Sequence, residues 1–157
     1  MRKIKLFFPL ILLLSCFLIG DLKEENPVFK EDFEGLEKIP ENWTKYFSVP
    51  DKVKISIDSS SSHSGKNSLL IENKDFCSST ICLNKISLKV GNIYRLKGWI
   101  KTERVCSDSE SRYPTSLPAC LSMHSFPFTN HSPTVGGTSD WTKVETLFIA
   151  TKSVDFV

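Results

Sequence analysis

The sequence has little net charge, no heptad pattern and no internal repeat. Its 157 residues include 20 lysines and arginines against 18 aspartates and glutamates, which gives a formal charge of +2. Arg2, Lys3 and Lys5 precede the first apolar run, and without these three the 17 remaining basic residues stand against 18 acidic ones, a charge of −1. This balance leaves no basic surface for nucleic acid, so we expect no nucleic-acid partner.

A long hydrophobic run is also missing. The uncharged run from Leu6 to Gly20 spans about 15 residues, whereas a membrane-spanning helix needs about 20. A basic start followed by an apolar run of this length is typical of a secretory signal peptide, which we predict over residues 1–20. An uncleaved signal anchor is the alternative.

Leu13-Leu14-Ser15-Cys16 resembles the lipobox of bacterial lipoproteins, in which cleavage before the cysteine is followed by lipidation of its thiol. The resemblance implies a membrane anchor through Cys16 and a polar tether over residues 21–27. Leu14 departs from the small residue of that pattern, and an ordinary cut near Gly20 is the alternative. The expected location is the bacterial cell envelope for a lipoprotein, or the medium for a secreted protein.

The cysteines beyond this segment are even in number. In an exported chain an even number indicates disulfides, and the nearest-neighbour pairing is the simplest of three. Zinc is the rival, helped by His124 and His131, but no C-x-x-C pair occurs and the spacings match no common zinc pattern. We expect disulfides among Cys77, Cys82, Cys106 and Cys120.

No amphipathic helix stands out, and short runs of alternating apolar residues fill the chain after residue 27. Val53, Ile55 and Ile57 alternate with polar residues, which is typical of a half-buried strand. Many short strands at regular spacing predict an all-β, antiparallel β-sandwich. The expected strands are 28–34, 52–58, 67–73, 81–90, 93–102, 117–126 and 141–150, with long loops over 103–116 and 125–139.

Gly65-Lys66 looks like part of a phosphate-binding loop, but the other requirements are absent. The pattern G-x-x-x-x-G-K-[ST] needs glycine where Ser60 stands and a hydroxyl residue where Asn67 stands. The loop must also open a helix, whereas a predicted strand follows Lys66. We therefore expect no nucleotide site, and Gly65 is expected to supply a backbone angle that other residues resist.

Four motifs follow one another in the order Phe33-Glu34 with Trp43, the His63–Lys66 loop, Gly91 to Trp99, and Gly137 to Trp141. Together they resemble a carbohydrate-binding-module-like domain of the galactose-binding jelly-roll type, over residues 28–150. The resemblance implies a jelly-roll sandwich over 28–157. Such domains run on for several strands and close with an acidic pair, so the sandwich is expected to be incomplete at its C-terminus.

The resemblance implies a structural calcium ion as cofactor. Glu34 and the main-chain carbonyl of Lys66 are the implied ligands, because calcium takes six to eight oxygen ligands. The acidic pair near the C-terminus that would complete the site is missing. A solvated Glu34 is the alternative. His63 is implied to have a structural role.

The fold also implies a sugar site built on exposed aromatic side chains. Strand parity separates Tyr94, Leu96 and Ile100 from the opposite face, where Trp99 lies among cations. Trp99 is either a stacking platform or a tryptophan covered by a loop. Trp43 and Trp141 are expected to plug the core or an edge. The expected ligand-binding residues are Trp99, Arg95, Lys97, Phe126 and Phe128.

Catalytic motifs are missing. No motif places two carboxylates around one bond as glycosidases require, and the histidines have no nucleophile motif nearby. We expect a non-enzymatic, exported or lipid-anchored surface module that binds a polysaccharide or glycan. The alternatives are a structural or interaction β-sandwich without a sugar site, and the N-terminal remnant of a larger secreted glycan-active enzyme.

Overall fold

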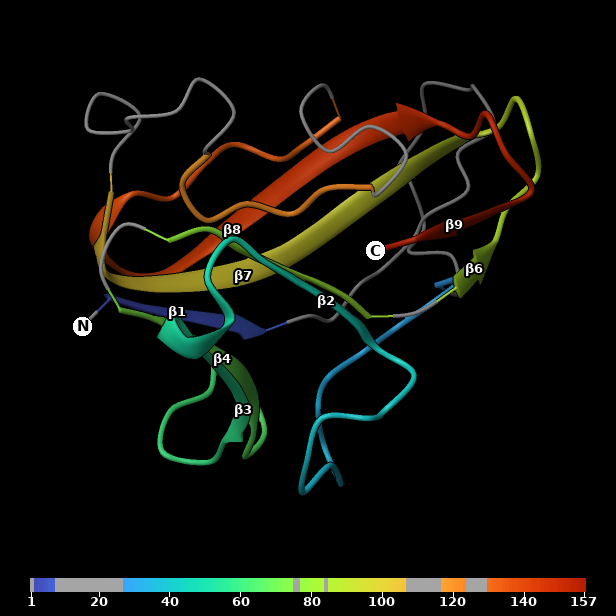
Figure 1. Ribbon diagram of the computed structural model, residues 1–157. Helices are drawn as coiled ribbons and strands as arrows, with labels where there is room; N and C mark the ends of the chain where they lie inside the picture. Colours follow the sequence, from blue (N-terminus) through green and yellow to red (C-terminus); the bar gives the residue numbers. More distant parts are fainter. Residues whose placement is uncertain (1, 8–26, 75–76, 84, 107–116, 124–129) are drawn as a thin grey trace.

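The computed structural model is built of antiparallel strands (Figure 1). It describes residues 2–7, 27–74, 77–83, 85–106, 117–123 and 130–157. The strands are β1 (Arg2–Phe7), β2 (Thr44–Phe47), β3 (Val53–Asp58), β4 (Ser68–Asn73), β5 (Ser79–Cys82), β6 (Lys85–Ser87), β7 (Ile93–Val105), β8 (Gly137–Ile149) and β9 (Val154–Phe156). A 3-10 helix, η1 (Pro50–Lys52), leads into β3, and this part of the chain contains no α-helix. The all-β, antiparallel prediction is confirmed.

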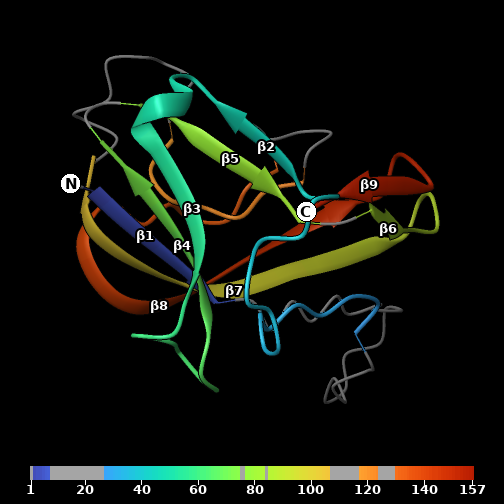
Figure 2. The ribbon, with the colours of Figure 1, turned by 60° about the horizontal axis from the view of Figure 1, so that its bottom comes forward.

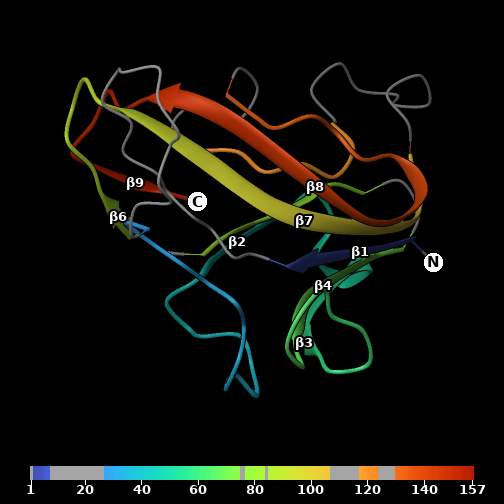
Figure 3. The same cartoon turned by 180° about the vertical axis from the view of Figure 1, so that it is seen from behind.

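A five-stranded sheet in the order β3-β4-β1-β7-β8 dominates the fold, and β2-β5 and β6-β9 form two short ladders beside it (Figure 2). β7 and β8, of 13 residues each, pair from Ile93–Ile149 to Val105–Gly137. The register shifts twice between Ile100 and Val105. Figure 3 shows this long pair crossing the molecule from behind.

The large sheet has an inner face that is packed into the core. Leu69, Leu96 and Ile100 are fully buried there, and alternating residues of β3 pack against the same cluster. Side chains from outside the sheet complete the core: Phe33, Trp43, Leu83, Ile86, Leu88, Ala119, Leu121, Met123, Val135, Ala150 and Val157. The opposite face, called the outer face below, carries Lys5, Trp99 and Lys101, so the parity prediction for β7 is confirmed.

Four of the predicted strands are confirmed. The ranges 52–58, 67–73, 93–102 and 141–150 correspond to β3, β4, β7 and β8, although β7 and β8 are longer than predicted. β3 and β4 place apolar side chains on the inner face at alternate positions, as a half-buried strand requires, whereas Gly98 interrupts this pattern in β7 and Thr146 interrupts it in β8.

The strand predicted over 28–34 is wrong, because local side-chain hydrogen bonds turn the chain there. Glu31 Oε1 accepts the Phe33 N–H at 2.8 Å, and Asp32 Oδ1 accepts the Glu34 N–H at 3.2 Å. Phe33 takes a left-handed φ of 61° and packs edge-on against Trp43, with ring centroids 6.1 Å apart. Acidic side chains that bond to nearby main-chain N–H groups favour turns over strands. Trp43 lies in the core, as expected.

The predicted strand 81–90 is divided between β5 and β6. Ile86 and Leu88 are buried as its alternation predicts, but Val90 is 61% exposed. Gly91 has a φ of 85°, so the chain turns at this point before β7. Within the described part of the predicted strand 117–126, isolated bridges join Ala119 to Val135 and Ser122 to His131. Residues 124–126 lie outside the described part.

β1 was not predicted as a strand, because the sequence assigns Arg2–Phe7 to the export signal. In the structure β1 lies between β4 and β7 and pairs antiparallel with both (Figures 1 and 3). Leu6 is buried in the core and Ile4 packs against it. The export signal stays a prediction, since residues 8–26 lie outside the described part. Among the residues described, no helix is long and apolar enough to cross a membrane.

Candidate functional site

The loop between β3 and β4 is fastened by the carboxylate of Glu34. Its Oε1 atom accepts hydrogen bonds from the main-chain N–H groups of Lys66 and Asn67, both at 2.8 Å. The Asn67 side-chain amide donates to the Phe33 carbonyl at 3.2 Å. The Phe33-Glu34 motif and the His63–Lys66 loop, which are far apart in sequence, are therefore in direct contact. The loop N–H groups hold a carboxylate of the same chain.

Glu34 and Lys66, the residues predicted to bind calcium, are thus neighbours. Their contact uses the N–H of Lys66, however, and not its carbonyl. The Gly65 carbonyl accepts the Ser62 hydroxyl at 3.0 Å, and the described residues contain no group of three or more His, Cys, Asp or Glu arranged to hold a metal ion. Calcium takes six to eight oxygen ligands, so it would need donors beyond Glu34 and Lys66, and the calcium site stays a prediction.

Three rings meet on the outer face, where His63 from the loop lies against Trp99 of β7 and Trp141 of β8. The His63 and Trp99 rings are stacked, with centroids 4.3 Å apart and planes 26° apart. His63 meets Trp141 edge-on at 6.0 Å and 77°. We call these three residues the aromatic cluster. His63 is exposed and both tryptophans are half-buried, so Trp99 is covered by a loop residue on one ring face.

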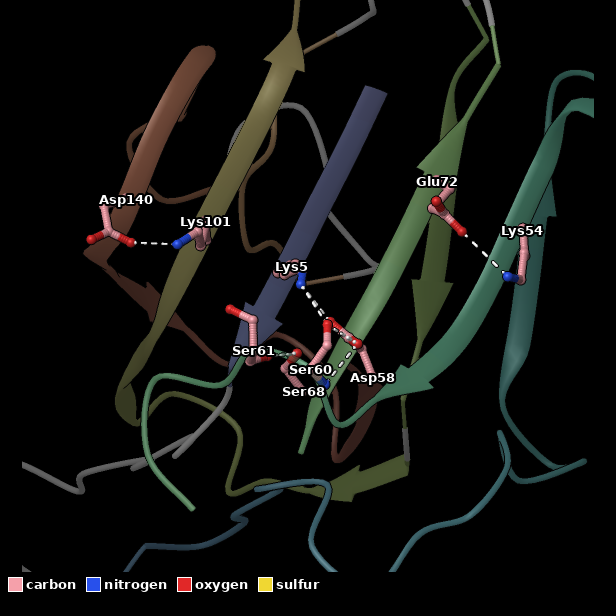
Figure 4. Close-up of polar contacts among 9 residues, drawn as sticks. All are labelled: Lys5, Lys54, Asp58, Ser60, Ser61, Ser68, Glu72, Lys101 and Asp140. Atoms are coloured by element: carbon pink, nitrogen blue, oxygen red, sulfur yellow. Dashed lines mark hydrogen bonds and ion pairs between the residues drawn. The ribbon is translucent and has the colours of Figure 1, made fainter. Parts of the chain in front are cut away.

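Ion pairs lie along the outer face of the same sheet (Figure 4). Lys101 Nζ lies 2.8 Å from Asp140 Oδ1, and its hydrogen bond holds the pKa of Asp140 below the ordinary value. Lys5 Nζ lies 2.6 Å from Asp58 Oδ2. Burial alone would raise the pKa of Asp58, but hydrogen bonds from Lys5 and Ser60 outweigh it and lower the pKa.

Farther along the same face, Arg95 and Lys97 lie near Glu145. The hydrogen bond from Lys143 lowers the pKa of Glu145, and the charges of Arg95 and Lys97 add to this effect. Lys97 pairs with Glu145 in the β7-β8 register and is 8% exposed. Lys97 therefore presents little surface to a ligand, whereas Trp99 presents more. The predicted site residues Phe126 and Phe128 lie outside the described part of the chain.

The expected disulfides are not found. Cys77, Cys82, Cys106 and Cys120, the cysteines of the described part, are all thiols. Cys77 Sγ donates to the Lys74 carbonyl at 3.0 Å, and Cys106 Sγ accepts a hydrogen bond from Arg2 Nη1 at 2.6 Å. Cys77 and Cys106 thus each have a hydrogen-bond partner other than a second sulfur. Cys16, the predicted lipidation site, lies outside the described residues.

His63 and Trp141 were not predicted as site residues, since His63 was expected to be structural and Trp141 to plug the core or an edge. The dipeptide Asp140-Trp141 entering a late strand was the available signal, because it places a tryptophan across from β7. The stacking of His63 on Trp99 joins a loop to a distant strand, and no local sequence pattern reports it.

No protein-family model matches this chain, and no match was found among curated proteins or solved structures. The resemblance to carbohydrate-binding-module-like domains therefore stays a prediction beyond the level of an antiparallel β-protein.

Proposed function

We propose that this protein is a non-catalytic, exported or lipid-anchored surface module that binds carbohydrate, with a jelly-roll-like sandwich fold. The observation that carries the proposal is the aromatic cluster on the outer face. Sugar rings present apolar C–H faces that stack on indole rings, and charged side chains nearby can bond to the hydroxyl groups. The Lys101–Asp140 pair offers such groups beside Trp141.

The stacking of His63 on Trp99 defines how the site would work. A sugar ring that stacks on Trp99 competes with the imidazole for the same indole face. His63 therefore acts as a cover that the ligand displaces, and the loop that carries it stays fastened through Glu34. Removal of the imidazole should uncover the indole.

Glycan-array binding of the purified full chain, with and without calcium, tests this proposal. Trp99→Ala should weaken binding about fivefold or more, and His63→Ala should strengthen it by up to about fivefold, because an aromatic contact contributes about 1 kcal/mol. Tyr46→Ala is the matched control, since Tyr46 is 47% exposed on β2 and lies outside the aromatic cluster. Absence of binding to every polysaccharide would refute the sugar function.

The second candidate is an interaction or structural β-domain without a sugar site. The same stacking contact favours it, since an indole face already covered by an imidazole needs no ligand. The His63→Ala variant separates the two candidates. In a structural domain it lowers the melting temperature and creates no glycan binding.

A further inference from the structure

The place of β1 in the sheet has a specific geometry. β1 pairs antiparallel with β4 on one side and with β7 on the other, over Arg2–Leu6 and Lys3–Phe7 respectively. β4 and β7 are therefore parallel to each other and separated by two strand spacings, about 9–10 Å. Main-chain hydrogen bonds cannot cross that distance. We call the space between β4 and β7 the strand slot.

The two faces of the strand slot require different side chains, apolar on the inner side and basic on the outer side. On the inner side, Ile4 and Leu6 complete the apolar core beside Leu69 and Ile100. On the outer side, Lys5 reaches Asp58, whose side chain is 11% exposed (Figure 4). A strand that fits must therefore alternate large aliphatic residues with lysine.

We propose that the strand slot is a peptide-binding site that accepts an extended segment of alternating lysine and large aliphatic residues, antiparallel to both β4 and β7. Arg2–Phe7 is the ligand supplied by the same chain. Strand addition of this kind takes its affinity from main-chain hydrogen bonds and its specificity from alternate side chains. The slot has two strand edges, so a bound peptide forms main-chain hydrogen bonds with β4 on one side and with β7 on the other.

The segment that fills the strand slot is also the start of the predicted signal peptide. Removal of residues 1–20 on export would open the slot and expose two facing strand edges, which are templates for pairing with another chain. The exported protein would then take its strand from a partner with the same alternating pattern. The role of the strand slot in the exported protein rests on the proposed function. Peptide binding to the slot does not, because it can be measured without export.

The experiment uses the full chain with a protease recognition sequence between Gly20 and Asp21. The protein is purified with β1 in place and cut, and a fluorescent peptide of sequence RKIKLF is added in excess. We expect saturable exchange of the labelled peptide into the cut protein, followed by fluorescence anisotropy. The uncut protein, in which β1 is tethered, should bind little or none, and it is the internal control.

Peptide variants test the specificity. Leu6→Asp should weaken exchange about 100-fold, because it places a carboxylate in the core. Lys5→Glu should weaken it about tenfold, because it faces Asp58. Cut protein carrying Asp58→Lys should reverse this preference and select the Lys5→Glu peptide, an outcome that nonspecific sticking of a cationic peptide cannot give.

Three results would overturn the proposal. The first is cut protein that releases residues 1–20, keeps its circular dichroism and melting temperature, and binds no peptide. The second is exchange that is insensitive to Leu6→Asp. The third is dimerisation of the cut protein that excludes the peptide, which would assign the strand slot to a second copy of the chain.

Discussion

Gly65 and Glu34 fit together so closely that a Cβ atom at residue 65 would lie 2.6 Å from Glu34 Oε1. Gly65 also has a φ of 70°, which side chains other than hydrogen disfavour. The glycine of the His63–Lys66 motif is thus required both by its backbone angle and by the carboxylate packed against it. The resemblance to a phosphate loop arises from a glycine that makes room for an internal anion.

Gly65→Ala should therefore destabilise the protein by about 1–3 kcal/mol in urea unfolding, through backbone strain and displacement of Glu34. Gly91→Ala is the matched control. Gly91 also has a positive φ, of 85°, but no atom lies within 4 Å of the position of its Cβ. Gly91→Ala should lower the free energy of unfolding only through backbone strain, by about 1 kcal/mol. Equal losses in the two variants would show that the contact with Glu34 adds nothing.

The Lys5–Asp58 pair predicts a loss of stability in acid. The pKa of Asp58 is lowered in the folded protein, against an ordinary value of 3.8. The unfolded chain therefore binds the proton more tightly, so this contribution is present above pH 3.8 and is lost as the pH falls through the lower folded pKa. Urea unfolding from pH 7 to pH 2 should show a weaker acid dependence in Asp58→Asn than in the parent.

The control for that experiment is Asp140→Asn. The pKa of Asp140 is also lowered, by Lys101, but its side chain is 83% exposed, so solvent screens the pair. Its replacement should change the acid dependence less than Asp58→Asn does. An equal or larger effect of Asp140→Asn would contradict the prediction that the less exposed Lys5–Asp58 pair contributes more to the acid dependence.

Glu31 predicts the opposite pH dependence. Its burial raises the pKa above the ordinary 4.5, although the hydrogen bond from Phe33 N–H acts the other way. The folded protein then holds the proton more tightly than the unfolded chain, so this residue stabilises the fold as the pH falls toward 4.5.

Glu31→Gln should accordingly raise the melting temperature at pH 7, since the amide oxygen can still accept the Phe33 N–H. The gain should shrink below pH 4.5, where the parent carboxyl is neutral as well. Thermal unfolding followed by circular dichroism measures both. A destabilised variant at pH 7 would mean that the hydrogen bond depends on the negative charge.

The cysteines should differ in reactivity. Burial raises the pKa of the Cys82 thiol and the nearby charge of Asp155 adds to it, and Cys82 is only 4% exposed. Alkylation of the folded protein at about pH 8 should therefore leave Cys82 unmodified while the half-buried Cys77 and Cys106 react. Mass spectrometry of the folded and urea-unfolded protein gives the comparison. Masses that reveal disulfides would restore the prediction made from the even number of cysteines.

Alternation within the chain was enough to predict β3, β4, β7 and β8, because burial of one sheet face imposes a period of two residues on each. Arg2–Phe7 has the same alternation, but a basic start before an apolar run also predicts an export signal, and that interpretation was preferred. The turn at Glu31 and Asp32 was missed because hydrogen bonds to single N–H groups overrode the apolar pattern.

The candidate site was predicted in part. Parity alone placed Trp99 opposite Ile100, and the structure agrees. The stacking of His63 depends on a loop whose path is fixed by Glu34, a residue far away in sequence. Lys97 carries a charge and was expected at the surface, but it pairs with Glu145 in the middle of two long strands and is buried.

The central position of β1 also sets a delay during synthesis. Leu6 precedes its partner Ile100 in the chain by more than 90 positions. At roughly 5–20 residues per second, that interval lasts on the order of 5–20 s. Throughout this time the N-terminal segment has no completed sheet to enter, and pairings over such long sequence separations form slowly. The predicted export signal would therefore be available for recognition before the sheet that can hold β1 is complete.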